Sequence, residues 1–220
     1  MNNMANINRS VQRCLAVLRS FRDNPRQTLT AITSEVQLPH PTVLRLLGTL
    51  EEEGYVRRAG GGGWELAPQI LEIGFAALQS MGIDEFVQSS LQRLADACSG
   101  TVNLGERNRD EVMIIARASG SVERRRLFIM NLRVGSTLPK SSALYTALDL
   151  VADKWTVAPY PDRKLISIGI AVPNNAGRSL ALGISVDIND YSAERIEKEI
   201  VPMLRREREE IQRLMLLGDI

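Results

Sequence analysis

Apolar residues in the first third of the chain recur at the spacing of short amphipathic helices. The clearest case lies between Pro41 and Gly54. Its apolar positions recur at i, i+3, i+4 and i+7, and they are Val43, Leu46, Leu47 and Leu50. Proline is favoured at the first position of a helix and glycine just beyond its last. The pattern therefore predicts one helix over this stretch, with Gly54 closing it.

Two shorter helices are predicted upstream. Ser10 is a candidate cap for the first, whose expected inward positions are Val11, Leu15, Leu18 and Phe21. Thr28 or Thr30 is a candidate cap for the second, in which Ile32 and Val36 are expected to face inward. Residues 37–39 then form a tight turn. Three helices with a tight turn between the second and the third form a helix-turn-helix core.

Two strand-like runs follow the third helix. They cover residues 55–58 and 64–66, and a glycine-rich loop separates them. This pattern predicts a β-hairpin, the wing of a winged helix.

The predicted third helix has a polar stripe opposite its apolar one. Thr42, Arg45 and Thr49 form this stripe, and His40 stands at its start. One cation and two hydroxyls suit contact with phosphates and base edges. On the wing, Arg57 and Arg58 are candidates for contact with the DNA backbone. Plain solvent exposure is the alternative for each of these residues.

After residue 67 the spacing of apolar residues alternates between that of helices and that of strands. Residues 68–82 and 83–98 have helical spacing, and the second helix is expected to bury Phe86, Val87, Leu91, Leu94, Ala95 and Cys98. Strand-like runs follow at residues 101–105, 112–117, 127–134, 165–172 and 179–186. Helical patterns cover residues 141–152 and 193–217, the latter capped by Ser192. Helices flanking an antiparallel sheet predict an α+β domain.

The composition is that of an ordinary globular protein and does not by itself indicate a function. With 220 residues, 44% of them hydrophobic, the chain can form two modest domains. It has no apolar run near the roughly 18 residues of a membrane span and no apolar leader, which predicts a cytoplasmic protein. Cys14 and Cys98 are expected to be reduced core thiols. The net charge of +1 does not by itself indicate nucleic-acid binding.

The inventory of reactive side chains argues against an enzyme. The sole histidine, His40, lies at the predicted third helix, so the rest of the chain cannot supply a Ser-His-Asp triad. No cysteines and histidines have zinc-site spacing. The four glycines at 60–63 are not followed by the Gly-Lys-Ser/Thr of a phosphate loop. We therefore predict no catalytic residue, no metal and no cofactor.

Four stretches resemble the IclR family of bacterial transcriptional regulators. In order, they are SVQRCL at 10–15, LPHPTVLRLL at 38–47, LEEEGYV at 50–56 and WELAP at 64–68. The resemblance implies a winged helix-turn-helix domain over residues 1–67, a linker helix over 68–82 that helps pair subunits, and an effector-binding domain over 83–220. That last domain is expected to be similar to the GAF and PAS folds. A linker helix packed on its own domain is the alternative.

The resemblance also extends to the second half of the chain. Residues 132–139 look like the family's glycine-to-proline turn, and residues 167–172 and 181–186 look like its final hairpin. It implies a pocket for a small organic or aromatic acid on the concave face of the sheet. The matching positions here are Ser141, Ser142, Tyr145, Ser167, Gly183 and Ser185. For each serine the alternative is a satisfied strand or cap hydroxyl.

This sequence departs from the family's pattern in two places. Gly183 stands where a side-chain donor is frequent, and residues 149–164 form a shorter stretch than the family usually has. A group of arginines is expected to form a solvated face, with contact of one of them with the ligand as the alternative; the group is Arg117, Arg124, Arg125, Arg126 and Arg133.

The resemblance implies a regulator that binds a palindromic DNA operator as a homodimer or a dimer of dimers and responds to a small acid. The alternative is a winged helix used for protein contact, with a sensor-like domain that mediates assembly. A steep salt dependence of duplex binding distinguishes the first from the second. The sequence leaves open whether transcription is repressed or activated, and which effector binds.

Overall fold

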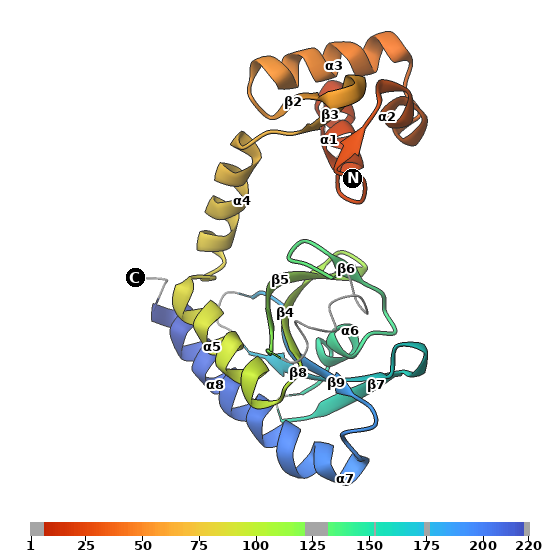
Figure 1. The fold of residues 1–220 in the computed structure, drawn as a ribbon. Coiled ribbons are helices and arrows are strands. Elements are labelled where there is room, and N and C mark those ends of the chain that lie inside the picture. The colour runs from red at the N-terminus through yellow and green to blue at the C-terminus, as the bar shows by residue number, and fades with distance from the viewer. Residues whose placement is uncertain (1–6, 122–131, 152, 174–176, 218–220) are drawn as a thin grey trace, which may run out of the picture. The chain divides into compact units, whose positions relative to one another are not determined.

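The computed structural model describes residues 7–121, 132–151, 153–173 and 177–217. The chain forms two compact units, residues 1–77 and residues 78–220, and the division falls inside helix α4 (Figure 1). An N-terminal helix-turn-helix and a C-terminal antiparallel sheet with helices confirm the predicted α+β class.

The first unit holds three helices and a small sheet. Its helices are α1 (Arg9–Ser20), α2 (Leu29–Val36) and α3 (His40–Glu52), followed by most of α4 (Gln69–Ser80). Its strands are β1 (Arg26–Gln27), β2 (Val56–Ala59) and β3 (Gly63–Leu66), with the 3-10 turn Gly60–Gly62 between the last two. The sheet order is β1-β3-β2, and all pairs are antiparallel.

Helix α1 differs from its prediction at both its cap and its face. Asn8, not Ser10, is the N-cap, and its side chain accepts hydrogen bonds from the N–H groups of Ser10 and Val11. Val11 is 52% exposed and Leu15 43% exposed, whereas the core contains Val17 together with Phe21. The prediction was therefore wrong for Val11 and Leu15 and correct for Phe21, which is buried, and Leu18, which packs against the core.

The helix-turn-helix itself agrees with the sequence. Thr28 caps α2, and its hydroxyl accepts from the N–H of Ala31 at 3.2 Å. Gln37, with φ of 53°, makes the left-handed turn into α3. Gly54, with φ of 76°, ends α3, and the N–H of Tyr55 reaches back to the carbonyl of Leu50 at 2.8 Å.

The second unit is built on a six-stranded antiparallel sheet. Its strands are β4 (Thr101–Asn108), β5 (Glu111–Ser119), β6 (Thr137–Leu138), β7 (Trp155–Tyr160), β8 (Leu165–Val172) and β9 (Leu180–Asp187), in the order β6-β5-β4-β9-β8-β7. Its helices are α5 (Glu85–Ala97), α6 (Ala143–Ala147), α7 (Ala193–Arg195), a π-helical turn (Ile196–Ile200) and α8 (Val201–Leu217). A 3-10 turn, Pro161–Arg163, precedes β8.

The two faces of this sheet are covered differently (Figure 1). Helices α5 and α8 pack together on one face over an apolar core that includes Leu104, Leu182 and Ile184. The short helix α6 packs on the other face, near Gly169 and Ala181. A Cβ at Gly169 would lie 2.7 Å from the carbonyl oxygen of Ala143, so this glycine lets α6 approach the sheet closely.

Several local predictions were wrong in this unit. The helix expected over 141–152 is only α6, and the stretch 149–164 contains strand β7, which was not predicted. Of the strand expected over 127–134, residues 127–131 lie outside the described residues and 132–134 form no strand. Phe86, expected inside α5, is 69% exposed, because it follows the cap Asp84 on the outer side of the first turn.

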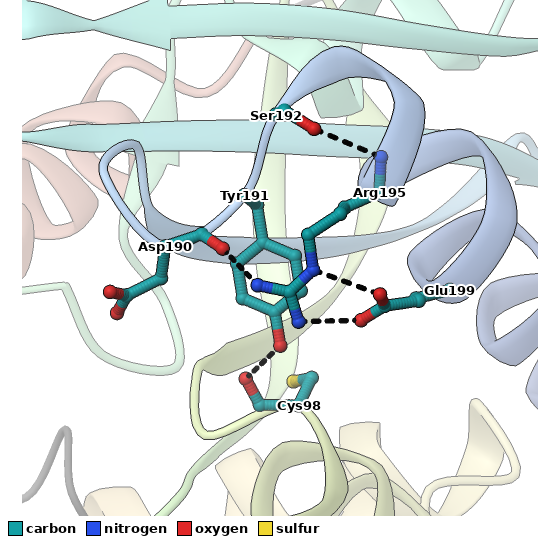
Figure 2. A network of polar contacts seen from close by, with 6 residues as sticks. All are labelled: Cys98, Asp190, Tyr191, Ser192, Arg195 and Glu199. Carbon is teal, nitrogen blue, oxygen red and sulfur yellow. Dashed lines mark hydrogen bonds and ion pairs between the residues drawn. The ribbon is translucent and has the colours of Figure 1, made fainter.

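A polar network fixes the start of the long C-terminal helix (Figure 2). Ser192 caps it, as predicted, and the Arg195 guanidinium donates to both carboxylate oxygens of Glu199 at 2.8 Å. The same guanidinium stacks on the ring of Tyr191, whose hydroxyl donates to the carbonyl of Cys98 at 3.3 Å. Burial raises the pKa of Tyr191 above its ordinary value. The network ties α7 to the end of α5.

Candidate DNA-binding surface and effector cleft

Helix α3 exposes the predicted polar stripe because the apolar side chains of its opposite face are buried in the core of the first unit. Val43, Leu47 and Leu50 are buried. His40, Arg45 and Thr49 are consequently exposed, while Thr42 is half-buried at the edge of the stripe. Thr49 donates its hydroxyl hydrogen to the carbonyl of Arg45 at 3.2 Å, which leaves that hydroxyl only as an acceptor for an outside donor.

Arg45 differs from the arginines of the wing in its partners. Within the part of the chain that the structure describes, no carboxylate lies within ion-pair distance of its guanidinium. A guanidinium without an acid partner can give all its donors to phosphate or guanine. Among the described residues, Arg45 therefore has no acid partner, whereas Arg57 and Arg58 both do.

Arg57 is held by an acid on the neighbouring strand. Arg57 and Arg26 lie on either side of Glu65 in the sheet register, and the Nε of each donates to its carboxylate at 2.7 Å. The hydrogen bonds from Arg57 and then Arg26 lower the pKa of Glu65. Arg26 was not predicted, because β1 has two residues and leaves no periodic signal in the sequence.

Arg58 points to the other face of the wing. Its guanidinium lies 3.7 Å from the centre of the Trp64 ring and 3.7 Å from Glu51 on α3. Trp64 is fully buried, and its indole N–H has no acceptor among the described residues. Arg58 therefore links the wing to the end of α3, so the two wing arginines are not equivalent.

In the second unit, a narrow cleft opens between α6 and the sheet. Its cavity volume is only about 20 Å³, so α6 nearly closes it against the sheet. It is lined by Asn103, Leu132, Leu138, Ser142, Ala143, Leu144, Tyr160, Ser167, Ile168, Gly183, Ile184 and Ser185. Four of the six effector positions expected from the sequence are in this lining, namely Ser142, Ser167, Gly183 and Ser185.

The two remaining positions do not line the cleft. Ser141 is exposed before α6. Tyr145 turns toward Arg107, whose guanidinium lies 5.2 Å from the ring centre and donates to the tyrosine hydroxyl at 3.4 Å. Ser142 is buried and caps α6, since its hydroxyl accepts from the N–H of Tyr145 at 3.2 Å. Its hydroxyl thus has a structural task as well.

The two strand serines are paired with each other. Ser167 on β8 faces Ser185 on β9, and their hydroxyl oxygens are 2.7 Å apart. Next to them, a Cβ at Gly183 would lie 3.2 Å from Cγ of Leu144 and 3.1 Å from the carbonyl oxygen of Ile168. Leu144 thus occupies the space that a side chain at position 183 would need.

Two polar residues of the cleft lining, Asn103 and Tyr160, were not predicted as site residues. Asn103 is buried on β4, and its side-chain oxygen accepts from Arg117 on β5 at 2.6 Å. Arg117 was assigned to a solvated face, but it is half-buried on the polar side of the sheet. Tyr160, on β7, lines the cleft, and burial raises the pKa of its hydroxyl. Arg133 is exposed as expected, and Arg124, Arg125 and Arg126 lie outside the described residues.

Two absences concern the described residues only. They include no helix both long enough and apolar enough to span a membrane. They also include no group of three or more histidine, cysteine or acidic residues arranged to hold a metal ion.

The sequence of the first unit is similar to known helix-turn-helix domains. Residues 10–60 match the IclR helix-turn-helix domain. The chain is 34% identical over 131 residues to the Pca regulon regulatory protein of Pseudomonas putida, a match that covers 59% of this chain and 44% of that protein. The chain spans about half the length of the curated relatives it matches.

Solved structures show the same fold over nearly the whole chain. An IclR family transcriptional regulator from Brucella abortus has a TM-score of 0.73 at 22% identity, covering 94% of this chain and 93% of that one. An IclR homolog from Microbacterium hydrocarbonoxydans, complexed with 4-hydroxybenzoate, has a TM-score of 0.74 at 17% identity, covering 94% and 99%. Residues 10–60 are thus similar to the IclR helix-turn-helix domain, and the chain has the fold of solved IclR-family proteins.

Proposed function

We propose that this protein is a transcriptional regulator that binds DNA through α3 and the wing, and whose operator binding is modulated by a small organic or aromatic acid. The observation that carries the proposal is the exposed face of α3, where Arg45 has no acid partner among the described residues. His40, Thr42 and Thr49 complete the proposed contact, and Arg57 with Arg58 supports it from the wing. The protein would act in the cytoplasm, without catalysing a reaction.

The proposed effector site is the cleft beneath α6. Ser167, Ser185 and Tyr160 offer hydroxyls, and the side chains of Asn103 and Arg117 lie in contact behind them. Hydroxyl and amide donors suit a carboxylate, and the apolar remainder of the lining suits a ring. The complex of the M. hydrocarbonoxydans homolog with 4-hydroxybenzoate supports this ligand class.

A homodimer is proposed from the surface of α4. None of its described residues is buried, and Leu71, Ile73 and Phe75 are 57%, 58% and 60% exposed. An apolar helix that exposes such residues is typical of an interface. A dimer, or a dimer of dimers, would present two α3 helices to a palindromic operator. Sedimentation equilibrium should show dissociation of Phe75→Asp at concentrations where the wild type stays associated; an unchanged mass would argue against this interface.

DNA binding is tested by fluorescence anisotropy with a duplex from the region upstream of the protein's own coding sequence. We compare the wild type, Arg45→Ala, and Arg163→Ala, which removes the same charge from the second unit. Arg45→Ala should weaken binding strongly and lower the slope of log affinity against log salt by about 1, as expected for one lost phosphate contact. Arg163→Ala should match the wild type. If the wild type does not bind the duplex, or binds it with an affinity that does not depend on salt, the result would favour the alternative, a winged helix used for protein contact.

The effector arm of the experiment uses 4-hydroxybenzoate and a panel of other small carboxylic acids. An acid that binds the cleft should raise the thermal midpoint of the wild type and change its affinity for the duplex. Asn103→Ala should remove both responses. Ser141→Ala is the control, because Ser141 lies outside the cleft lining and its replacement should change neither response.

A further inference from the structure

Two residues on the exposed face of α3 have no evident task inside the protein. Leu44 is 45% exposed, although Val43 and Leu47 already fill the core on the other side. Gly48 lies in the interior of the helix, and a Cβ built there meets no atom within 4 Å. Neither residue is explained by packing within its own unit.

The glycine is the more informative of the two. Glycine is among the least favourable residues in a helix interior, because it loses the most backbone freedom on folding. Gly48 does not have the positive φ that would require a glycine, and no neighbour excludes a side chain. An alanine would therefore suit the isolated protein better. The missing side chain instead leaves room for a surface that approaches α3 from outside.

The positions of these residues define the shape of that surface. His40, Leu44 and Gly48 follow one another at i, i+4 and i+8, so they form one line along the helix. Arg45 and Thr49 form the adjacent line, and both are exposed. The exposed face thus has a projecting leucine side chain, one helical turn before a position without a side chain. The guanidinium of Arg45 and the hydroxyl of Thr49 lie beside this pair.

We propose that Leu44 and Gly48 read a thymine in the operator. The side chain of Leu44 packs on the C5-methyl group of the thymine, which projects into the major groove, and Gly48 lets the edge of the base pair come close to the helix backbone. Among the four bases only thymine offers a methyl group at that edge. A lone leucine beside an arginine suits a base edge better than a protein partner, which would need a contiguous apolar patch. This inference rests on the proposed DNA-binding function and adds a specificity determinant to it.

Uracil substitution tests the methyl contact directly. The probe is the upstream duplex described above, with each thymine replaced in turn by uracil, which removes the methyl group and keeps the base pair. At one or two positions in each half-site, wild-type affinity should fall about 3- to 10-fold. Leu44→Ala should bind the thymine and uracil duplexes equally. Arg45→Ala should weaken binding to both and keep their ratio.

Gly48 is tested by substitutions of increasing size. Gly48→Ala should raise the thermal midpoint of the protein yet weaken DNA binding, and Gly48→Leu should weaken it further. Because the thermal midpoint should rise while the affinity for DNA falls, weaker binding by Gly48→Ala could not be explained by loss of folding. Equal wild-type affinity for all thymine and uracil duplexes, or full affinity in Gly48→Ala, would overturn the inference while leaving the regulator proposal intact. No wild-type binding to the duplex at any salt concentration would overturn both.

Discussion

The two faces of the six-stranded sheet are made by the same strands but hold different kinds of residue. On β9, Leu180 and Leu182 belong to the core under α5 and α8, whereas Gly183 and Ser185 line the cleft beneath α6. Alternation along a strand sends neighbours to opposite faces, so one strand serves both. The difference indicates that one face holds the fold together, while the other keeps buried polar groups that the proposed effector could contact.

The largest effect is expected from the apolar face. Leu182 is fully buried there, so Leu182→Ala should lower the free energy of unfolding by about 2–5 kcal/mol, through lost burial and the cavity left behind. Leu138→Ala, at a half-buried leucine in the cleft, should cost less than half as much. Urea unfolding followed by circular dichroism gives both values. Equal losses would mean that the two faces contribute alike.

The next effect concerns the close approach of α6. Gly169→Ala would place a Cβ 2.7 Å from a backbone oxygen, and the resulting shift of α6 should cost about 1–3 kcal/mol and reduce effector binding. Gly105→Ala is the milder comparison, because its Cβ would lie 3.3 Å from a methyl of Val112 and no closer than 3.5 Å to a backbone atom. Unfolding and ligand-induced thermal shifts measure the two outcomes. A neutral Gly169→Ala would show that α6 is not held by this contact.

A smaller effect is expected from the serine pair of the cleft. Ser185→Ala leaves the hydroxyl of Ser167 without its partner and should cost about 1 kcal/mol. Replacing both serines by alanine should cost no more than the single change, because no polar group is then left unpaired. A double-mutant cycle by urea unfolding tests this. Additive losses would mean that the two hydroxyls act independently.

The smallest effect belongs to an acid between the helices of the apolar face. Glu207 on α8 accepts a hydrogen bond from Ser90 on α5, and burial raises the pKa of its carboxyl above 4.5. The folded protein then takes up this proton at a higher pH than the unfolded chain, so stability falls as pH rises from 4.5 through the folded pKa. Glu207→Gln should remove that part of the slope, which begins near the unfolded value of 4.5 and lies above it. Glu197→Gln, at an exposed acid, should keep it.

What the sequence predicted well depends on local signals. Helix α3 has a helical period, a proline at its start and a glycine at its end, and it was predicted almost to the residue. Strand β7 was missed because Pro159 interrupts its pattern, which is tolerated because β7 is an edge strand. An element was predicted correctly where the residues that mark its start, its period and its end all lie within the element itself.

The candidate sites could be predicted only in part, for a related reason. Ser167 and Ser185 were found through a family resemblance that covers their own hairpin. Asn103 and Tyr160 come from β4 and β7, and only the strand register brings them to the same cleft. Likewise, the pairing of Arg57 with Glu65 depends on the register of β2 and β3. No single stretch of sequence contains such information.

The central pairing of the sheet also has a consequence for the order of folding. Strand β4 pairs with β9, so that Thr101 lies opposite Ser185, whereas α1, α2 and α3 meet within a short stretch of chain. Closing so long a loop is slow compared with forming local contacts. During synthesis the winged helix can fold while the β4–β5 hairpin still lacks its partner. The apolar side of that hairpin then stays uncovered until β9 has left the ribosome, and uncovered apolar surface of this kind promotes aggregation.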